Sequence, residues 1–251
     1  MIQTKNLFKW SGLLLLALLI LASCKKDDEE EDPPEDTPEE QVATTPTPDF
    51  AVGDGAVIAV QAITVTQTDF GPIETNIGTG VAVFTDDLFQ TFHTAGNVSL
   101  NSNDLTVNEN NSYTYIPDIT NPLGIVFAGT VNWEVSGGNG TPAFSLDLSS
   151  QGFPDVDPIS SSTTVPLSGY TLTTTNVSNA DSVLFLIGDV QRTLGPGSTS
   201  CTFTADDLSG LSAGSSFAQI AAYNHSINDI GSGQNIHGIN ETVQTVSVTL
   251  E

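Results

Sequence analysis

The folded part of this chain is predicted to be all-β. Apolar and polar residues alternate with a period of two in many short segments from residue 55 to the end, as in strands buried on one face. Gly, Ser, Thr and Asn are abundant and only 14% of the residues are charged, a composition that suits strands joined by turns. The one hint of helix is a single turn at residues 206–211.

Residues 1–23 predict a signal peptide. Lys5 and Lys9 precede an unbroken apolar run of 10 residues, Leu13 to Ala22, which is too short for a membrane span of about 20 residues. The run ends in Leu21-Ala22-Ser23-Cys24. This resembles the lipobox of bacterial lipoproteins, in which the chain is cut before the cysteine and the thiol is acylated. The resemblance implies that acyl chains on Cys24 hold the protein in a membrane, since each buried methylene contributes about 0.8 kcal/mol. A free cysteine after an ordinary secretory signal is the alternative.

Residues 24–50 predict a disordered acidic linker. Ten acidic residues lie between Asp27 and Glu40, and five prolines occur up to Pro48, so the segment cannot bury apolar surface. The run Lys25-Lys26-Asp27-Asp28-Glu29 follows the lipid cysteine directly and resembles the surface-export signal of Bacteroidetes lipoproteins. The resemblance implies an outer-membrane lipoprotein exposed at the cell surface. An ordinary solvated charge run is the alternative.

The charge of the folded part excludes some partners. From Asp49 onward, 20 acidic side chains face one basic side chain, Arg192, which gives a net charge of −19 without the histidines. Such a surface repels phosphate backbones and anionic lipid, so nucleic acid is not an expected partner. It suits cation binding, or solubility in a salty medium that screens the repulsion.

Residues 51–152 are predicted to form a first β-sandwich. The polar turn Asn101–Asp104 lies between two short apolar segments and predicts a hairpin. Val131, Trp133 and Val135 share one face of a predicted strand, which places Trp133 in the core. Further strands are expected at residues 63–68, 81–84, 98–100, 105–107, 113–115 and 144–148.

Residues 153–251 are predicted to form a second sandwich, after an irregular segment at 151–158 interrupts the alternation. The continuous apolar run Val183–Ile187 predicts a central strand covered on both faces. Cys201 alternates with Phe203 and is expected to be a buried structural thiol, because acylation of Cys24 leaves it no intramolecular partner. Further strands are expected at residues 170–172, 218–222 and 246–250.

Each half has roughly the 100 residues of an immunoglobulin-like sandwich. In the second half, the segments Ser168–Leu172, Asp181–Leu184 and Cys201–Thr204 precede Asp206-Asp207-Leu208. They are similar to immunoglobulin-like modules of bacterial surface proteins, in which such strands precede a one-turn helix. The resemblance implies two tandem immunoglobulin-like sandwiches, and one larger jelly-roll-like sandwich is the alternative. The whole chain resembles surface lipoproteins of Bacteroidetes, which implies a location and a fold but no activity.

The longest segment without alternation, Asn224–Thr242, is predicted to be a loop. Long loops are often functional, and spaced isoleucines predict that this one packs on the sandwich. Its oxygen-bearing side chains are of the type that bind Ca²⁺, but no Ca²⁺-loop motif occurs, so no cofactor or metal is predicted and solvated turns explain them. His93, His225 and His237 show no metal-ligand spacing and are expected at the surface. The candidate binding residues of the loop are His225, Asn228, Asp229, His237 and Glu241.

One sequence motif suggests a hydrolase. Gly210–Gly214 matches G-x-S-x-G with Ser212 at its centre, and Asp229 and His237 follow in the order of a catalytic triad. The nucleophile elbow needs a strand before the serine and a long helix after it. Neither is predicted here, so no catalytic residue is assigned.

Three tyrosines and one serine are the remaining candidates. Tyr113, Tyr115 and Tyr223 are of the type that stacks on sugar rings, or that sits at a core rim with the hydroxyl in water. Asp181-Ser182-Val183 resembles the Bacteroidetes O-glycosylation motif, although a plain strand start explains Ser182 as well.

These observations predict a non-enzymatic surface lipoprotein that binds a glycan or an envelope protein. A structural or adhesive spacer and an extracellular hydrolase are the alternatives.

Overall fold

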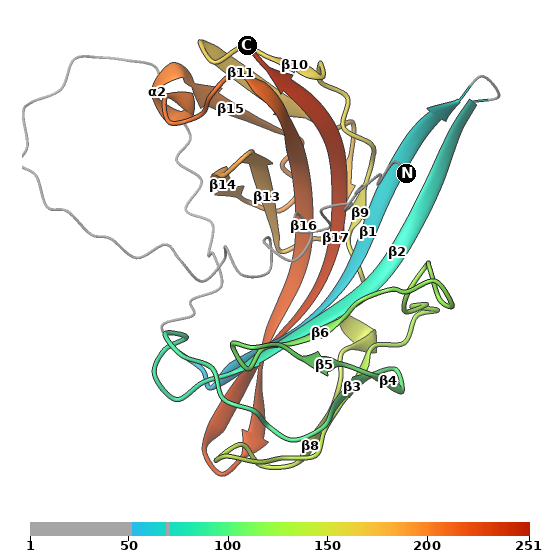
Figure 1. Cartoon of the computed structure of the whole chain (residues 1–251), viewed down its shortest axis with the longest axis vertical. Coiled ribbons are helices and arrows are strands. Elements are labelled where there is room, and N and C mark those ends of the chain that lie inside the picture. The colour runs from blue at the N-terminus through green and yellow to red at the C-terminus, as the bar shows by residue number, and fades with distance from the viewer. Residues whose placement is uncertain (1–51, 69–70) are drawn as a thin grey trace, which may run out of the picture. The chain divides into compact units, whose positions relative to one another are not determined.

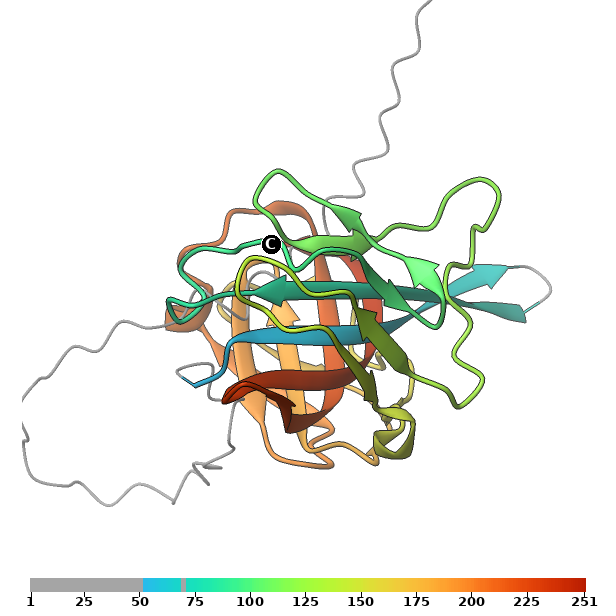
Figure 2. The ribbon, with the colours of Figure 1, turned by 90° about the horizontal axis from the view of Figure 1, so that it is seen from below.

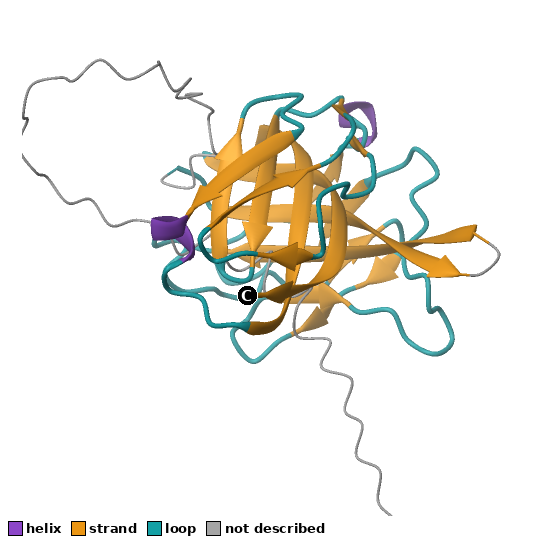
Figure 3. Cartoon of the chain, turned by 90° about the horizontal axis from the view of Figure 1, so that it is seen from above, coloured by secondary structure: helices purple, strands orange, loops and turns teal. Residues whose placement is uncertain are grey.

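The computed structural model describes residues 52–68 and 71–251. The signal peptide, Cys24, the export signal from Lys25 to Glu29 and the linker lie outside these residues. Nearly all regular structure in the described part is β, so the predicted all-β class is confirmed (Figure 3). Within these ranges, none of the helices has the length and apolar character that crossing a bilayer requires.

A nine-stranded sheet forms the centre of the described part (Figure 1). Eight strands follow one another in the order β14-β13-β16-β17-β1-β2-β6-β5, and β10 pairs with β17 off this path. The strands are β1 (Gly55–Thr68), β2 (Gly71–Phe84), β5 (Thr106–Val107), β6 (Tyr113–Tyr115), β10 (Thr164–Val165), β13 (Ser182–Ile187), β14 (Val190–Leu194), β16 (Gly214–Gly231) and β17 (Gln234–Leu250).

Three smaller sheets accompany the central one. Their strand orders are β4-β3-β7-β8, β11-β15 and β12-β9. The strands are β3 (Val98–Leu100), β4 (Asn103–Asp104), β7 (Asn132–Val135), β8 (Phe144–Asp147), β9 (Asp155–Val156), β11 (Gly169–Thr173), β12 (Val177–Ser178) and β15 (Ser200–Thr204). A 3₁₀ turn, η1 (Ser149–Gln151), and a one-turn helix, α2 (Ala205–Leu208), complete the described elements.

The strands β16 and β17 form one long hairpin in the middle of the central sheet. They pair without a break from Gly214–Leu250 to Asp229–Asn235, with one irregularity before the turn at Ser232-Gly233. The segment Asn224–Thr242 is therefore not the predicted loop but the distal half of this hairpin. Its alternation was hidden because several of its buried positions are polar.

In the view of Figure 1, the first core lies between the lower part of the central sheet and the sheet β4-β3-β7-β8. Trp133 and Leu100 pack on Val57 and Ala82 of the central sheet, and Trp133 is fully buried as predicted. Gly80 allows the close approach, because a Cβ there would lie 2.8 Å from Leu100 Cδ2. A hairpin is confirmed here, but its turn is shorter than predicted, with Leu100 paired to Asn103 across two residues. Thr106–Val107, predicted as its second strand, pairs with β6 instead.

In the view of Figure 1, the second core lies between the upper part of the central sheet and the strands β9, β11, β12 and β15. Phe185 of β13 and Ile220 of β16 pack on Leu172 and Phe203. All residues of β13 are buried, which confirms the prediction of a strand covered on both faces. Cys201 is 4% exposed in the same core, and burial raises the pKa of its thiol to about 11, so it is the predicted inert, buried cysteine.

Both cores lie on the same face of the central sheet. Ile236 of β17 belongs to the first core, whereas Val248 and Leu250 of the same strand belong to the second. These residues are an even number of positions apart, and alternate residues of a strand point to one face. The strand β1 pairs with β17 over nine residues, from Gly55–Ile236 to Ile63–Gln244.

The arrangement differs from two sandwiches joined end to end. All described residues belong to one compact unit. The predicted boundary near residue 152 separates most of the two cores, but β16 and β17 cross it and serve both. The difference arises because the C-terminal strand returns to pair with the N-terminal strand, a long-range contact that alternation in sequence does not reveal.

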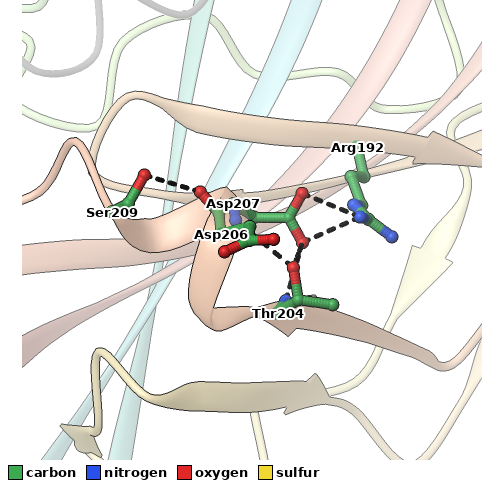
Figure 4. Close-up of polar contacts among 5 residues, drawn as sticks. All are labelled: Arg192, Thr204, Asp206, Asp207 and Ser209. Carbon is green, nitrogen blue, oxygen red and sulfur yellow. Dashed lines mark hydrogen bonds and ion pairs between the residues drawn. The ribbon is translucent and has the colours of Figure 1, made fainter.

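The predicted helical turn is present as α2. Thr204 caps it, accepting the Asp207 N–H at 3.3 Å, while Asp207 accepts the Thr204 N–H at 2.6 Å (Figure 4). Both carboxylate oxygens of Asp207 also lie 2.8 Å from Arg192 Nη2. The hydrogen bond from Arg192, with those from Thr204, lowers the pKa of Asp207 to about 2.

Candidate functional site

A row of buried polar side chains on β17 separates the two cores. Asn240, Thr242 and Gln244 are 0–4% exposed and lie between the apolar residues of the same face. Each donates a hydrogen bond to a backbone carbonyl of the segment 148–156: Asn240 to Leu148 at 3.0 Å, Thr242 to Pro154 at 2.7 Å and Gln244 to Val156 at 3.0 Å. Buried carbonyls need such donors. The row therefore fixes the segment 148–156, which connects the two halves, to the central sheet.

The neighbouring strand extends this polar row. Asn224 donates to the carbonyl oxygen of Gln151 at 2.9 Å, and the Gln151 amide returns a bond to the Asn224 carbonyl at 2.7 Å. Ser226 donates to Gln151 Oε1 at 2.9 Å, and Asn228 donates to Ser226 Oγ at 3.0 Å. Asn228, a candidate binding residue, is therefore part of a structural network.

The two histidines of the candidate set form a pair on the opposite face of the hairpin. His225 Nε2 and His237 Nδ1 lie 2.8 Å apart, and the rings stack with centroids 5.0 Å apart. His237 Nε2 lies 2.5 Å from the carbonyl oxygen of Val52 and must donate there, so its Nδ1 accepts from His225. Burial, followed by the nearness of His237, lowers the pKa of His225. The expected surface position is wrong for His237, which is fully buried.

Glu241 is a buried carboxyl on that same opposite face, between Val60 of β1 and Tyr223 of β16. It is 3% exposed, and its Oε1 has no hydrogen-bond partner among the described residues. Burial alone raises the pKa of Glu241 to about 7. Asp229, by contrast, is exposed near the hairpin turn, where its Oδ1 accepts the Gly231 N–H at 2.7 Å.

An open depression of about 640 Å³ lies where the two halves meet, beside the His225 backbone. Its polar groups are held in place by hydrogen bonds. Asn179 Nδ2 and Ser178 Oγ donate to Asp155 Oδ2 at 2.9 and 3.1 Å, and Asp181 Oδ2 accepts the His225 N–H at 2.9 Å. The lining residues are Gln151, Ser178, Asn179, Ala180, Asp181, Pro196, Gly197 and Asn224.

Comparisons with family models, curated proteins and solved structures find no match to this chain.

The residues of the hydrolase reading do not come together. Ser212 lies in an exposed turn with the helix α2 before it and the strand β16 after it, the reverse of a nucleophile elbow. Asp229 lies near the other end of β16, roughly 45–50 Å away along the strand at 3.3 Å per residue. No cluster of three metal-ligating side chains occurs among residues 52–68 and 71–251.

The aromatic candidates are structural. The Tyr113 hydroxyl accepts the Ala95 N–H and donates to the Gly96 carbonyl, both at 2.8 Å. Tyr115 accepts from Asn121 Nδ2 at 2.9 Å, and Tyr223 is buried, with its pKa raised by burial to about 12. Ser182 is 1% exposed at the start of β13, which places it beyond the reach of a modifying enzyme in the folded protein.

Sequence reasoning missed Asp181 and Asn179 as binding candidates. Asn179 adopts a φ of +55°, which asparagine tolerates better than most residues, and it sits between two short strands. The available signal was an asparagine and an aspartate two residues apart, just before a buried strand.

Proposed function

We propose that this chain is a non-enzymatic, lipid-anchored binding protein of the bacterial cell surface, which takes a glycan chain in the depression between its two halves. The supporting observation is that the amide of Asn179, the hydroxyl of Ser178 and the carboxylate of Asp181, which line the depression, are each already held by a hydrogen bond. Preorganised polar groups suit a ligand with many hydroxyls, because little conformational freedom is lost on binding.

The charge of the molecule narrows the glycan class. Twenty acidic side chains and one basic side chain follow residue 48. An anionic polysaccharide would be repelled, so the expected ligand is neutral. Asp181 and Asn179 are the groups expected to contact sugar hydroxyls, with Asp181 as acceptor and Asn179 as acceptor through its side-chain oxygen.

A screen of the full chain on arrayed glycans tests the proposal. The expected result is binding of neutral glycans that falls at least 10-fold in Asp181→Asn, because a hydrogen bond to a charged group contributes about 1.5–3 kcal/mol. Asparagine keeps an oxygen that can accept the His225 N–H, so the fold should survive.

Glu134→Gln is the matched control. Glu134 lines a second open depression, on the outer side of the four-stranded sheet, and carries the same kind of carboxylate. Retained binding in this variant, with loss in Asp181→Asn, supports the site. No binding by the well-folded chain, or equal binding by both variants, contradicts it.

A further inference from the structure

The hairpin β1–β2 extends beyond the rest of the central sheet. The two strands stay paired up to Thr68–Gly71. However, β17 leaves β1 after Ile63, and β6 pairs with β2 only from Gly80 to Ala82. Figures 1 and 2 show this part of the hairpin standing away from the other strands. Beyond Gly78, the outer edge of β2 therefore has no neighbouring strand among the described residues.

The open edge of β2 has defined donors and acceptors. Gly78 donates its N–H to the Leu123 carbonyl and accepts the Ile125 N–H, both at 2.9 Å, so its backbone groups point outward. Alternate residues of a strand repeat this direction, so the N–H and C=O groups of Asn76 and Glu74 also point outward. Pro72, the next such position, has no N–H, so the open edge ends there.

Exposed apolar side chains lie beside this edge. The segment 123–125 reaches Gly78 closely, since a Cβ there would lie 1.8 Å from the Ile125 carbonyl oxygen. On this segment Leu123 is 52% exposed, and on β2 itself Ile73 is 56% exposed. Natural proteins usually protect a free strand edge with charges, and Glu74 is the one charged residue between Ile73 and Gly80.

We propose that the β2 edge at Glu74 and Asn76 receives an extended strand of a partner protein. Among protein ligands, an extended strand matches outward N–H and C=O groups at a spacing of two residues. The exposed Leu123 and Ile73 would contact apolar side chains of that strand. The partner strand is neutral or basic, because the folded part carries one basic and 20 acidic side chains. The same charge disfavours a second copy of this chain as the occupant.

Selection of phage-displayed linear peptides on the full chain, purified in detergent, tests this inference. The expected peptides have alternating apolar residues and few acidic ones. Their binding should slow hydrogen exchange of the Glu74 and Asn76 amides. Asn76→Pro removes the outward N–H and should weaken binding at least 10-fold, whereas Asn76→Ala keeps it and should bind as the wild type does.

A second variant guards against misfolding of Asn76→Pro. Leu123→Asp places a charge in the apolar contact without changing any residue of β2, and it should also weaken peptide binding. The inference is overturned if selection returns no such peptides, if Asn76→Pro and Leu123→Asp bind like the wild type, or if protection appears on other strands. Self-association of the full chain through this edge, seen by sedimentation, would equally overturn it.

Discussion

Glu241 shows at the scale of one residue how a buried charge links stability to pH. Its pKa is raised from 4.5 to about 7 by burial, so the folded chain holds a proton on Glu241 that the unfolded chain releases between these values. The stability from this site is complete below pH 4.5 and is lost as the pH rises to about 7. At 1.36 kcal/mol per pKa unit, the loss is on the order of 3 kcal/mol.

Glu241→Gln is expected to remove this dependence. The variant should be more stable than the wild type above pH 7 and should match it more closely near pH 4.5. Urea unfolding at both pH values measures the difference. Asp229→Gln, at an exposed position on the same hairpin, is the control and should show no such change. The burial argument is contradicted if Glu241→Gln keeps the pH dependence of the wild type, or if Asp229→Gln loses it.

His225 acts in the opposite direction. Its pKa is lowered from 6.5, mainly by burial, so the unfolded chain binds more protons and stability falls as the pH drops below 6.5. His225→Gln should flatten that acid limb in urea unfolding below pH 6.5, and His93→Gln, which changes a half-buried histidine outside the pair, should leave it in place.

Asn240 is expected to be essential for the connection between the halves. Its amide donates to the carbonyls of Leu148 and Gly152. Asn240→Ala leaves the buried Leu148 carbonyl without this donor and should reduce the free energy of unfolding by about 1–3 kcal/mol. Asn132→Ala, at an exposed position of β7, should change it by less than about 0.5 kcal/mol. Equal losses in the two variants would contradict this role.

At the scale of elements, local signals in the sequence predicted local structure. Val183–Ile187, the hairpin at 98–104 and the turn α2 all depend on neighbouring residues, and all are confirmed. The distal part of the β16–β17 hairpin was missed because Asn224, Asn240 and Thr242 occupy buried positions where a strand normally carries apolar residues. Their partners lie up to 92 residues away, so no local pattern announces them.

One substitution is expected to stabilise the turn of the hairpin at 98–104. Asn101 and Ser102 have φ values of +48° and +62°, the conformation of a type I′ turn. Ser102→Gly should stabilise the protein by about 1 kcal/mol, because glycine adopts positive φ without a Cβ clash.

Asn101→Gly is the matched variant for this turn. It should bring no such gain, since Asn101 also donates to the Thr130 carbonyl and accepts the Asn132 N–H, both at 2.8 Å. Thermal unfolding compares the two variants, and a larger gain from Asn101→Gly would contradict this assignment.

For the whole molecule, the all-β class followed from composition and alternation, whereas the shared sheet did not. It depends on pairing between β1 and β17, about 180 residues apart in the chain. The candidate-site residues likewise divide into those that the sequence could reveal and those that it could not. The residues of the predicted loop lie together on one hairpin, but Asp181 joins the depression only through the fold.

The shared sheet predicts that the two cores unfold together. Val98→Ala, in the first core, should destabilise that core by about 2–3 kcal/mol. Hydrogen exchange of the β13 amides, in the second core, should then speed up to the same degree. Val107→Ala, at a 45% exposed position, should leave both unchanged. Unchanged exchange in β13 of Val98→Ala would show that the cores unfold separately.

The proposed anchor makes a prediction for the intact chain. Cys24→Ser should abolish incorporation of labelled palmitate and move the protein from the membrane fraction to the soluble fraction. Cys201→Ser is the matched control, because Cys201 is the other cysteine of the sequence and is buried in the second core. Label retained in Cys24→Ser would remove the basis for the surface assignment.

The position of β1 also determines how the protein responds to mechanical force. The strand β1 is hydrogen-bonded to β17 on one side and to β2 on the other. A force that acts along β1 loads both rows of bonds in shear rather than peeling them one at a time. Rupture then needs many bonds to break together.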